Sequence, residues 1–474
     1  MSLTDASSGD LAERLFGAAW EALGGPETHV EFTGTKAFAV PFGVTQLGAA
    51  GFAAVGAALA ELLSAATGDA PEVVVDRELA SGWLRMTSIP VGDWQRPSPW
   101  HDVSTDYPTA DGRWVRLQAN YPHLRDAAAR ALGVSVDRDA WAAVIAAAGA
   151  DEIEQAIVDG GGAAAASRTL AEWAAHEQGR SVAVEPLIDR VDGEAVTDSW
   201  RPTPGRPLSG IRILDITRVL AGPMATRCLA GYGAEVLRID PAGYAEPNGD
   251  SGGDLTWGKR CAFLALDTDE GRARFLELLA GADVFVHGLR PGALEALGLG
   301  EEVRRSVRPG LVDVTLDAYG WSGPWNARRG FDTLVQTSSG ISTELMHRFG
   351  LSQPRLLPAQ VLDFATGYLM AASVIRGLTR RMTEGRGSSW RLALARTASL
   401  LISAGEPPAA PELTVPLSGP VEDRVFSSPQ GAYRRLVFPL TVHGSPLFWE
   451  RPGDPYGSSV PLWSTQPGSG RSAA

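Results

Sequence analysis

Asp363 is the residue of this sequence whose surroundings best suit covalent chemistry. It lies within residues 356–377, just ahead of a predicted helix, and is flanked by Leu362 and Phe364. A carboxylate between apolar neighbours is partly desolvated, and amides at a helix start can position it, so it is able to act as a nucleophile. An aspartate that opens a helix is also commonly an N-cap, which contributes about 1 kcal/mol without any chemistry. Both interpretations stay open at this point.

Positive side chains form a second group with chemical potential. Residues 217–223 follow a predicted strand and include Arg218, Val219, Leu220 and Ala221. The loop lacks the Gly-x-Gly-x-x-Gly spacing of dinucleotide sites, and no P-loop is found. Several cations on one rim would pair with phosphates through charge-assisted hydrogen bonds, although a single arginine more often solvates a surface. Further cations of this half include Arg227, Arg238, Lys259, Arg260 and Arg290.

The elements around these residues predict a parallel sheet. Apolar runs predict strands at residues 211–216, 235–239, 262–266, 284–287 and 311–316. Helical patterns separate them at residues 224–231, 271–279 and 292–298. Strand–helix–strand units this short indicate parallel pairing, because a crossover helix is needed to return the chain. This half is therefore predicted to be a doubly wound α/β domain, whose ligands bind beyond the carboxyl ends of the strands.

The first half has a different pattern. Helices are predicted at residues 11–23 and 48–66, with a short strand at 72–76. Asp111-Gly112 is a strong turn signal inside a hairpin at residues 107–118. Alanine-rich helices are expected from 124 to 176, with a loop at 160–162. Residues 201–210 contain three prolines and two glycines and form the clearest linker.

Composition excludes several classes of function. The chain has 474 residues and a formal net charge of −13, which argues against a nucleic-acid-binding face and a polybasic membrane surface. Its two cysteines are too few for a disulfide framework or a cysteine-based metal site. No signal peptide is visible at the start, and the longest apolar stretch, residues 51–63, is too short for a membrane span. We therefore expect a soluble cytoplasmic protein.

Several blocks of the second half resemble the class III coenzyme A transferases, the CaiB/BaiF family. They are LSGIRILDITRVLAGPMATRCLAGYGAEVLRID, WGKRCAFLALDTDEGR, ADVFVHGLRPGALEALGLG and GWSGPWNARRGFDTLVQTSSGIS, followed by Asp363 and its helix. The first half resembles the other part of the same family. Residues 1–205 are similar to the family's C-terminal half, residues 206–400 to its Rossmann-like part, and residues 401–474 to its tail. The order of the two halves is thus reversed.

The resemblance also indicates an internal duplication. VPFGVTQLGAAGFAAVGAALAELLSAATGDAPEVVVDRELA looks like a second copy of the aspartate helix and the strand that follows it. Aligning the small residues of the two helices places Gln46 opposite Asp363. Because a glutamine side chain is neutral and forms no acyl intermediate of the family's kind, the first copy is expected to be structural.

The resemblance implies a fold, a reaction and a site. The fold would be a Rossmann-like doubly wound sheet domain with a smaller α+β domain. The reaction would transfer coenzyme A from an acyl-CoA to a carboxylic acid through anhydride and thioester intermediates on Asp363. No permanently bound cofactor or metal is implied, and family members are interlocked homodimers. The implied coenzyme A contacts are Arg218, Val219, Leu220, Ala221, Arg238, Lys259, Arg260 and Arg290.

Two alternatives accompany this interpretation. Related racemases use a histidine in a Gly-His-Asp sequence, where this chain reads Gly330-Phe331-Asp332, and phenylalanine transfers no proton. His287, at a strand end where the family has an Asn-Phe pair, is the nearest other base and more often a structural residue. The rearranged order is also compatible with a non-catalytic protein that binds coenzyme A esters or serves as a partner subunit.

Overall fold

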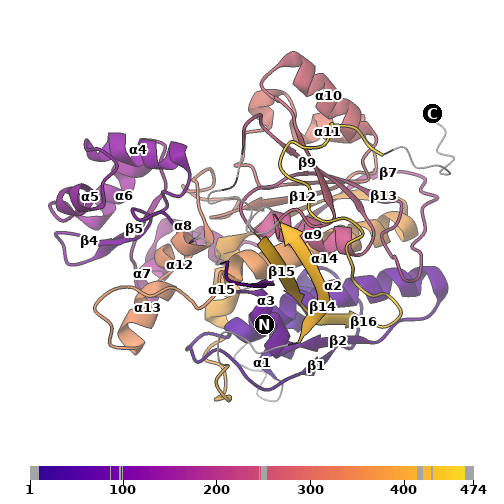
Figure 1. Ribbon diagram of the computed structural model, residues 1–474, viewed down its shortest axis with the longest axis horizontal. Coiled ribbons are helices and arrows are strands. Elements are labelled where there is room, and N and C mark those ends of the chain that lie inside the picture. The colour runs from indigo at the N-terminus through magenta and orange to yellow at the C-terminus, as the bar shows by residue number, and fades with distance from the viewer. Residues whose placement is uncertain are drawn as a thin grey trace.

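A seven-stranded sheet forms the centre of the larger domain (Figure 1). The computed structural model describes residues 10–85, 87–94, 98, 100–244, 246, 254–413, 420–428 and 431–464. The strand order is β10-β9-β8-β11-β12-β13-β7, and only β7 is antiparallel to its neighbour. The strands are β7 (Asp189–Ala195), β8 (Arg212–Ile216), β9 (Glu235–Asp240), β10 (Lys259–Phe263), β11 (Val284–His287), β12 (Val312–Asp317) and β13 (Arg386–Ala393).

Helices cover both faces of this sheet. On one face lie α9 (Ala221–Gly231) and α14 (Val361–Glu384), and on the other lie α10 (Asp269–Ala280) and α11 (Glu301–Val307) (Figure 1). Successive strand residues point to opposite faces, so Ile213 packs in the same cluster as Met224 of α9, whereas Leu214 packs with Phe275 of α10. Burial on both faces explains why these strands are continuously apolar in the sequence. The predicted doubly wound α/β fold is confirmed.

Element boundaries depart from the prediction in two places of this domain. The strand expected at 262–266 begins earlier, as β10 at Lys259, because Lys259 is fully buried with its charge paired. The helix expected at 292–298 is a turn with the short 3₁₀ helix η2 (Glu295–Leu297). Left-handed glycines at both ends, Gly292 and Gly298, limit it to that length.

A smaller α+β domain lies apart from the sheet, at the left of Figure 1. The predicted hairpin is confirmed as β4 (Asp106–Pro108) and β5 (Trp114–Leu117), with the turn glycine Gly112 at φ 75°. Helices α4 (Pro122–Leu132), α5 (Arg138–Ile145) and α6 (Ala150–Asp159) pack on it. The expectation of helices alone up to residue 176 is wrong, because β6 (Ala164–Ala166) pairs with β5. Tertiary pairing outweighs the helical preference of alanine there.

The N-terminal region builds a second, much smaller sheet. Its order is β1-β2-β16, from β1 (Glu31–Thr33), β2 (Val73–Asp76) and β16 (Leu440–Val442). Helices α1 (Leu11–Ala22), α2 (Val44–Thr67) and α3 (Arg77–Trp83) accompany it. The predicted helices and the strand at 72–76 are thereby confirmed, and α2 lies directly against α14 (Figure 1).

The α2 helix is longer than the apolar stretch recognised in the sequence. Both α2 and α14 have 24 residues and are apolar enough, by length and composition, to cross a membrane. They are 78% and 100% buried within the protein over their most apolar windows. Packing inside the protein therefore accounts for their apolar character. The prediction that the apolar segment around residues 51–63 is too short to span a membrane is wrong for α2, which has 24 residues.

The remaining elements connect the chain's distant segments. Strands β14 (Val421–Ser428) and β15 (Gly431–Leu436) pair with β3 (Ser88–Pro90), so residues 401–474 share two sheets with residues 1–205. The helices not yet described are α7 (Leu170–Ala175), α8 (Glu177–Val184), α12 (Asp332–Ser338), α13 (Ile341–Arg348) and α15 (Leu394–Ser403).

Candidate active site

A cavity of about 340 Å³ opens at the carboxyl ends of the parallel strands and contains Asp363. We call it the Asp363 cavity. Its lining combines four parts of the chain: the start of α4, the loop from β8 into α9, the segments after β11 and β12, and the start of α14. The lining residues are Tyr121, His123, Leu124, Thr217, Arg218, Val219, Leu220, Ala221, Gly222, Tyr244, Gly288, Leu289, Arg290, Ala293, Leu316, Asp317, Ala318, Arg328, Arg329, Gly330, Phe331, Asp363 and Leu394.

Asp363 lies inside the first turn of α14 and is therefore not the N-cap of this helix, the alternative that the sequence left open. The helix begins at Val361, and its N-cap Gln360 makes no side-chain capping hydrogen bond. The cap comes from another helix, because a carboxylate oxygen of Asp332 accepts the Asp363 backbone N–H at 3.0 Å. Asp363's own carboxylate is thus released from capping and lines the cavity.

Asp332 is itself held rigidly. It is fully buried, and the Gln336 side-chain amide donates to its second oxygen. Gln336 in turn accepts the Leu357 N–H at 2.8 Å, which fixes the segment leading to α14. Two carboxylates are therefore placed side by side at the start of one helix.

This arrangement makes the charged form of Asp363 unfavourable. Burial, followed by the neighbouring Asp332 carboxylate, raises the pKa of Asp363 well above its ordinary value. Burial also raises the pKa of Asp332 to about 6. Perturbed carboxylates inside a cavity are typical of functional sites. A reaction that converts the Asp363 carboxylate into a neutral acyl derivative would relieve the repulsion.

A buried ion pair holds the cavity loop, residues 217–222 from the end of β8 into α9, in position. The Lys259 ammonium lies 3.1 Å from Asp215 and donates to the Pro223 carbonyl at 3.0 Å, inside the first turn of α9. Asp215 also accepts the backbone N–H of Thr217 at 2.8 Å and the hydroxyl of Thr226. Lys259 is fully buried and does not line the cavity. Its predicted contact with phosphate is therefore wrong, and it positions the loop instead.

The loop itself is strained at Val219. With φ 68°, Val219 is the non-glycine residue at positive φ in the described part of the chain. A β-branched residue rarely adopts this conformation, and strain of this kind concentrates at functional sites. Its N–H donates to Glu246 at 3.0 Å, and the Tyr121 hydroxyl donates to the same carboxylate. The strained loop is thus tied to the smaller domain.

Arg238 is part of this support and does not face the cavity. Its fully buried guanidinium bonds Asp240 at 2.8 Å and Glu246 at 3.2 Å. The prediction that Arg238 contacts a phosphate is wrong, because Arg238 does not line the cavity and its charge is already paired with these two carboxylates. Arg218 lines the cavity, with 37% of its side chain exposed, and lies over the Tyr244 ring at 4.8 Å.

Arg260 is also absent from the cavity lining. Its guanidinium donates to the Leu462 carbonyl at 2.6 Å and the Val460 carbonyl at 3.3 Å, and it lies 3.5 Å from Glu235. The tail segment runs along β10, where Ala262 pairs with Ser459. Because the tail occupies this edge of the sheet, the predicted phosphate contact of Arg260 is wrong as well.

Other cations of the cavity escaped the sequence reasoning. Arg328 and Arg329 line it beside the predicted Arg290, and His123 adds an imidazole from α4. Arg329 donates to the Gly161 carbonyl at 2.7 Å, and Arg290 to the Ala327 carbonyl at 3.4 Å. Within the described residues, neither Arg329 nor Arg290 forms an ion pair with a carboxylate. The adjacent arginines of the sequence Asn-Ala-Arg-Arg-Gly, within a block already singled out, were the available signal.

Asp317 is a further cavity residue that the sequence did not reveal. It ends β12, is 5% exposed and accepts the N–H groups of Tyr319 at 2.9 Å and Gly320 at 3.1 Å. Burial raises the pKa of Asp317 to about 7. A carboxyl group at the end of a predicted strand was the only signal, and it is a weak one.

Two residues discussed for proton transfer take structural positions. Phe331 lines the cavity and stacks against Tyr121, with 6.3 Å between the ring centroids. His287 is buried outside the cavity lining, with 3.1 Å between its Nε2 and the Thr315 hydroxyl. Burial, with Arg304 and Arg391 nearby, lowers the pKa of His287 well below its ordinary value.

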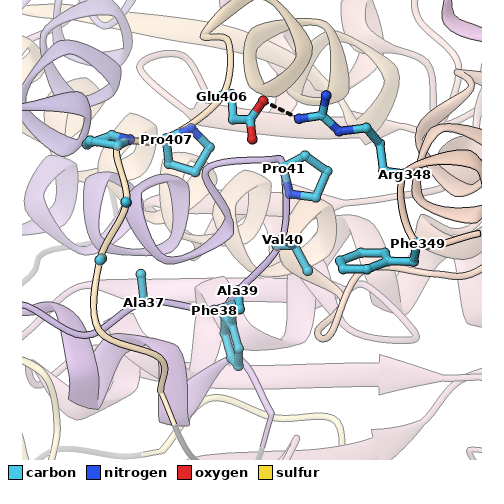
Figure 2. A pocket seen from close by; sticks show the side chains of 12 residues that line it. Ala37, Phe38, Ala39, Val40, Pro41, Arg348, Phe349, Glu406 and Pro407 are labelled. Atoms are coloured by element: carbon cyan, nitrogen blue, oxygen red, sulfur yellow. Dashed lines mark hydrogen bonds and ion pairs between the residues drawn. The ribbon is translucent and has the colours of Figure 1, made fainter.

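A second cavity, of about 320 Å³, lies next to the start of α2 (Figure 2). We call it the Pro41 cavity. Residues 37–41 and 406–410 line it together with Arg348 and Phe349. Figure 2 shows that Arg348 is paired with Glu406, and the rest of the lining is mainly apolar or proline. Gln46 does not line it.

Part of this chain is similar to known proteins. Residues 208–406 match the model of CoA-transferase family III. The matched segment contains the cavity loop, Arg328 and Arg329, and both Asp332 and Asp363. The cavity residues Tyr121, His123 and Leu124 lie outside it.

Individual relatives match over part of their length. The chain is 33% identical over 228 residues to an acetyl-coenzyme A transferase of Hypoxylon pulicicidum, covering 45% of this chain and 38% of that protein. It is 32% identical over 201 residues to the human succinyl-CoA:glutarate CoA-transferase, covering 38% and 44%. A crystal structure of a hypothetical protein from Mycobacterium tuberculosis matches with 32% identity, covers 41% of this chain and 57% of that one, and has a TM-score of 0.37. The chain thus spans less than half of the length of the two named transferases.

Proposed function

We propose that this protein is a coenzyme A transferase that moves coenzyme A from an acyl-CoA to a carboxylic acid, with Asp363 as the nucleophile. The observation that carries the proposal is one cavity that holds a desolvated carboxylate, a strained strand-end loop and several arginines. The match of residues 208–406 to the model of CoA-transferase family III supports it.

The arginines of the cavity suit the phosphates of coenzyme A. Arg218, Arg290 and Arg329 offer guanidinium groups at one opening, and charge-assisted hydrogen bonds between guanidinium and phosphate are strong. The loop 217–222 would follow the nucleotide and pantetheine, as expected at the carboxyl ends of a doubly wound sheet. The overall charge of −13 is no obstacle, because only the local field at the cavity matters.

The reaction follows from one carboxylate. Asp363 attacks the thioester carbonyl, the carbon–sulfur bond breaks, and an aspartyl acyl anhydride and the CoA thiolate form. The thiolate attacks the aspartyl carbonyl, which releases the donor acid as a carboxylate and leaves an aspartyl-CoA thioester. The acceptor carboxylate repeats the two steps in reverse order, giving the new acyl-CoA and regenerating the Asp363 carboxylate. Each step exchanges one acyl bond for another, so no oxidant or metal is required.

The electrostatics of the site favour this chemistry. The Asp363 carboxylate is destabilised beside Asp332, and both the anhydride and the thioester on Asp363 are uncharged. Formation of either therefore removes a like-charge repulsion. The first amides of α9, at Ala221 and Gly222, line the same cavity and would stabilise oxyanions that develop on the reacting carbonyls.

Trapping tests the proposal directly. The protein is mixed with a panel of acyl-CoAs and treated with hydroxylamine or borohydride, and modified peptides are identified by mass spectrometry. We expect modification at Asp363 in the native protein and in Gln46→Ala, and none in Asp363→Asn, which should still bind coenzyme A. Gln46→Ala is the matched control because it changes the third residue of the other 24-residue helix.

The alternatives predict other results. A non-catalytic binding protein or partner subunit would bind coenzyme A without forming an adduct or exchanging the thiol with any donor. A racemase would exchange the α-proton of an acyl-CoA in deuterated water. Phe331 argues against that exchange, because it stands where the racemases have their proton-transferring histidine. Proton exchange without any acyl transfer would refute the proposed transferase.

A further inference from the structure

The block α2–β2–α3 repeats the block α14–β13–α15 without insertion or deletion. Both first helices have 24 residues and end at a left-handed glycine, Gly68 in one block and Gly385 in the other. In the first block β2 ends at Asp76 and α3 starts at the next residue, and in the second β13 ends at Ala393 and α15 starts at the next. Gln46 and Asp363 are each the third residue of their helix.

The neighbours of the two blocks correspond as well. Strand β1 pairs with β2 in parallel, as β12 pairs with β13. Strand β16 pairs with β2 antiparallel, as β7 pairs with β13. Helix α1 packs on α2, as α9 packs on α14. The first sheet, β1-β2-β16, therefore reproduces the β12-β13-β7 end of the large sheet and, within the described residues, has no counterparts of β8 to β11.

What the smaller copy keeps is the packing face. The Phe52 and Tyr368 rings of α2 and α14 lie 4.0 Å apart. A Cβ on Gly51 would lie 3.3 Å from the Tyr368 Cβ and 3.4 Å from the Ala365 Cα, so the two helices approach closely. Arg376 of α14 pairs with Glu61 of α2 and donates to the Gly24 carbonyl at 2.7 Å.

What the smaller copy lacks is a binding face. Among the residues that the structure describes, strands β8 and β11, whose loops line the Asp363 cavity, have no equivalent beside α2. The hollow near the start of α2 is the Pro41 cavity, where the Arg348 charge is already paired with Glu406 (Figure 2). The copy thus covers α14, and its Pro41 cavity offers no unpaired arginine to a polyanion.

The Asp363 cavity, in contrast, is lined by both domains of the same chain. Tyr121, His123 and Leu124 of the smaller domain line it together with Arg329 and Asp363 of the larger domain. The Tyr121 hydroxyl and the Val219 N–H donate to the same Glu246 carboxylate, so the two domains meet at the cavity.

We propose that the α2–β2–α3 block stands in for the same block of a second subunit, so that one chain forms a self-sufficient catalytic unit with a single site. This replaces the homodimer expected from the family resemblance. Covering α14 is the physical reason, because its apolar faces would otherwise require a partner chain. That the single site acts on coenzyme A esters rests on the proposed function.

Sedimentation and ligand titration test the unit. We expect a species of one 50 kDa chain that binds one coenzyme A, with an affinity that does not change between nanomolar and micromolar protein. Binding found only in a two-chain species, and lost on dilution, would overturn the inference. This measurement needs no turnover, so it stands even when the proposed transferase activity is absent.

Mixing two defective variants tests whether the site is shared. Asp363→Asn removes the nucleophile, and His123→Asp places a negative charge on the small-domain side of the cavity. We expect co-expressed chains of the two kinds to show no more adduct than the separate variants added together. Recovery towards about a quarter of the native signal, the share of correctly paired sites in random dimers, would show that one chain's Asp363 works with another chain's residue 123. If His123→Asp alone keeps its activity, the titration decides the stoichiometry.

Discussion

A carboxylate oxygen of Asp332 accepts the backbone N–H of Asp363 at 3.0 Å, so one buried acid caps the helix that carries the other. The bond fixes the position of Asp363, and the charge of Asp332 opposes ionisation of its neighbour. The two effects of Asp332 can be separated by Asp332→Asn, because an asparagine at residue 332 keeps an oxygen that accepts the hydrogen bond and removes the negative charge.

We therefore expect Asp332→Asn to shift the pH dependence of Asp363 acylation. The neighbouring carboxylate raises the pKa of Asp363, so its removal lowers that pKa. The acid limb of the acylation rate should move to lower pH by about one unit, and the rate on the alkaline plateau should fall. Rapid-quench measurement of the adduct from pH 4 to 9 checks both. An unchanged limb with a lower plateau would assign Asp332 a role in position alone.

The cavity arginines should govern coenzyme A affinity, and the buried ones should not contact it. Arg290→Gln and Arg329→Gln are each expected to weaken binding about 5- to 20-fold, since each removes a charge-assisted hydrogen bond of about 1–2 kcal/mol. The matched control is Arg260→Gln, whose guanidinium bonds tail carbonyls. Isothermal titration at two salt concentrations measures the effect. Equal losses in all three variants would place the ligand elsewhere.

Lys259 should matter for stability far more than for ligand contact. Lys259→Met leaves the buried Asp215 carboxylate without its cation, which costs about 3–5 kcal/mol of unfolding free energy. Urea denaturation followed by tryptophan fluorescence measures it. Adding Asp215→Asn should recover part of the loss. If Lys259→Met alone left the urea midpoint unchanged, the stabilising role of the Lys259–Asp215 ion pair would be contradicted.

Gly367 should tolerate no side chain. A Cβ there would lie 2.3 Å from the Ala221 carbonyl oxygen, so Gly367→Ala must displace the start of α9 and the cavity loop. We expect lower thermal stability together with weaker coenzyme A binding. Gly17→Ala is the control, since no atom lies within 4 Å of its Cβ, and it should be neutral or stabilise α1 by about 0.5–1 kcal/mol. Similar melting curves for the two variants would refute the close contact.

Asp317 should make stability depend on pH near neutrality. Burial raises the pKa of Asp317 to about 7, so the folded protein holds the proton more tightly than the unfolded chain. The stability that this protonation contributes is present below the unfolded pKa and is lost as pH rises from about 4 to about 7. Asp317→Asn should therefore be more stable than the native protein at pH 8, by on the order of 2–4 kcal/mol, and nearly equal at pH 4. Denaturation at both pH values checks this, and a difference independent of pH would argue against it.

The sequence by itself predicted most elements of the larger domain and the candidate residue Asp363. Strands β8, β9, β11 and β12, helices α9 and α10 and the hairpin around Gly112 follow from apolar periodicity and turn chemistry, which are properties of neighbouring residues. The loop at Arg218 and the helix of Asp363 were found in the same way, because each is a contiguous motif. The pairing of Gln46 with Asp363 was visible as well, since the two helices keep the same register.

Tertiary structure alone decided which charges face the cavity. The partners of Lys259 and Arg260 are Asp215 and the tail carbonyls, which come from other parts of the chain. Arg238 pairs with Asp240 and Glu246 close by in the sequence, but only the folded structure shows that it is buried behind the cavity. The cap of Asp363 by Asp332 and the strand β6 among alanines have the same origin. Hydrogen bonds and ion pairs between distant segments leave no periodic trace in a sequence, because their geometry exists only after the chain has folded.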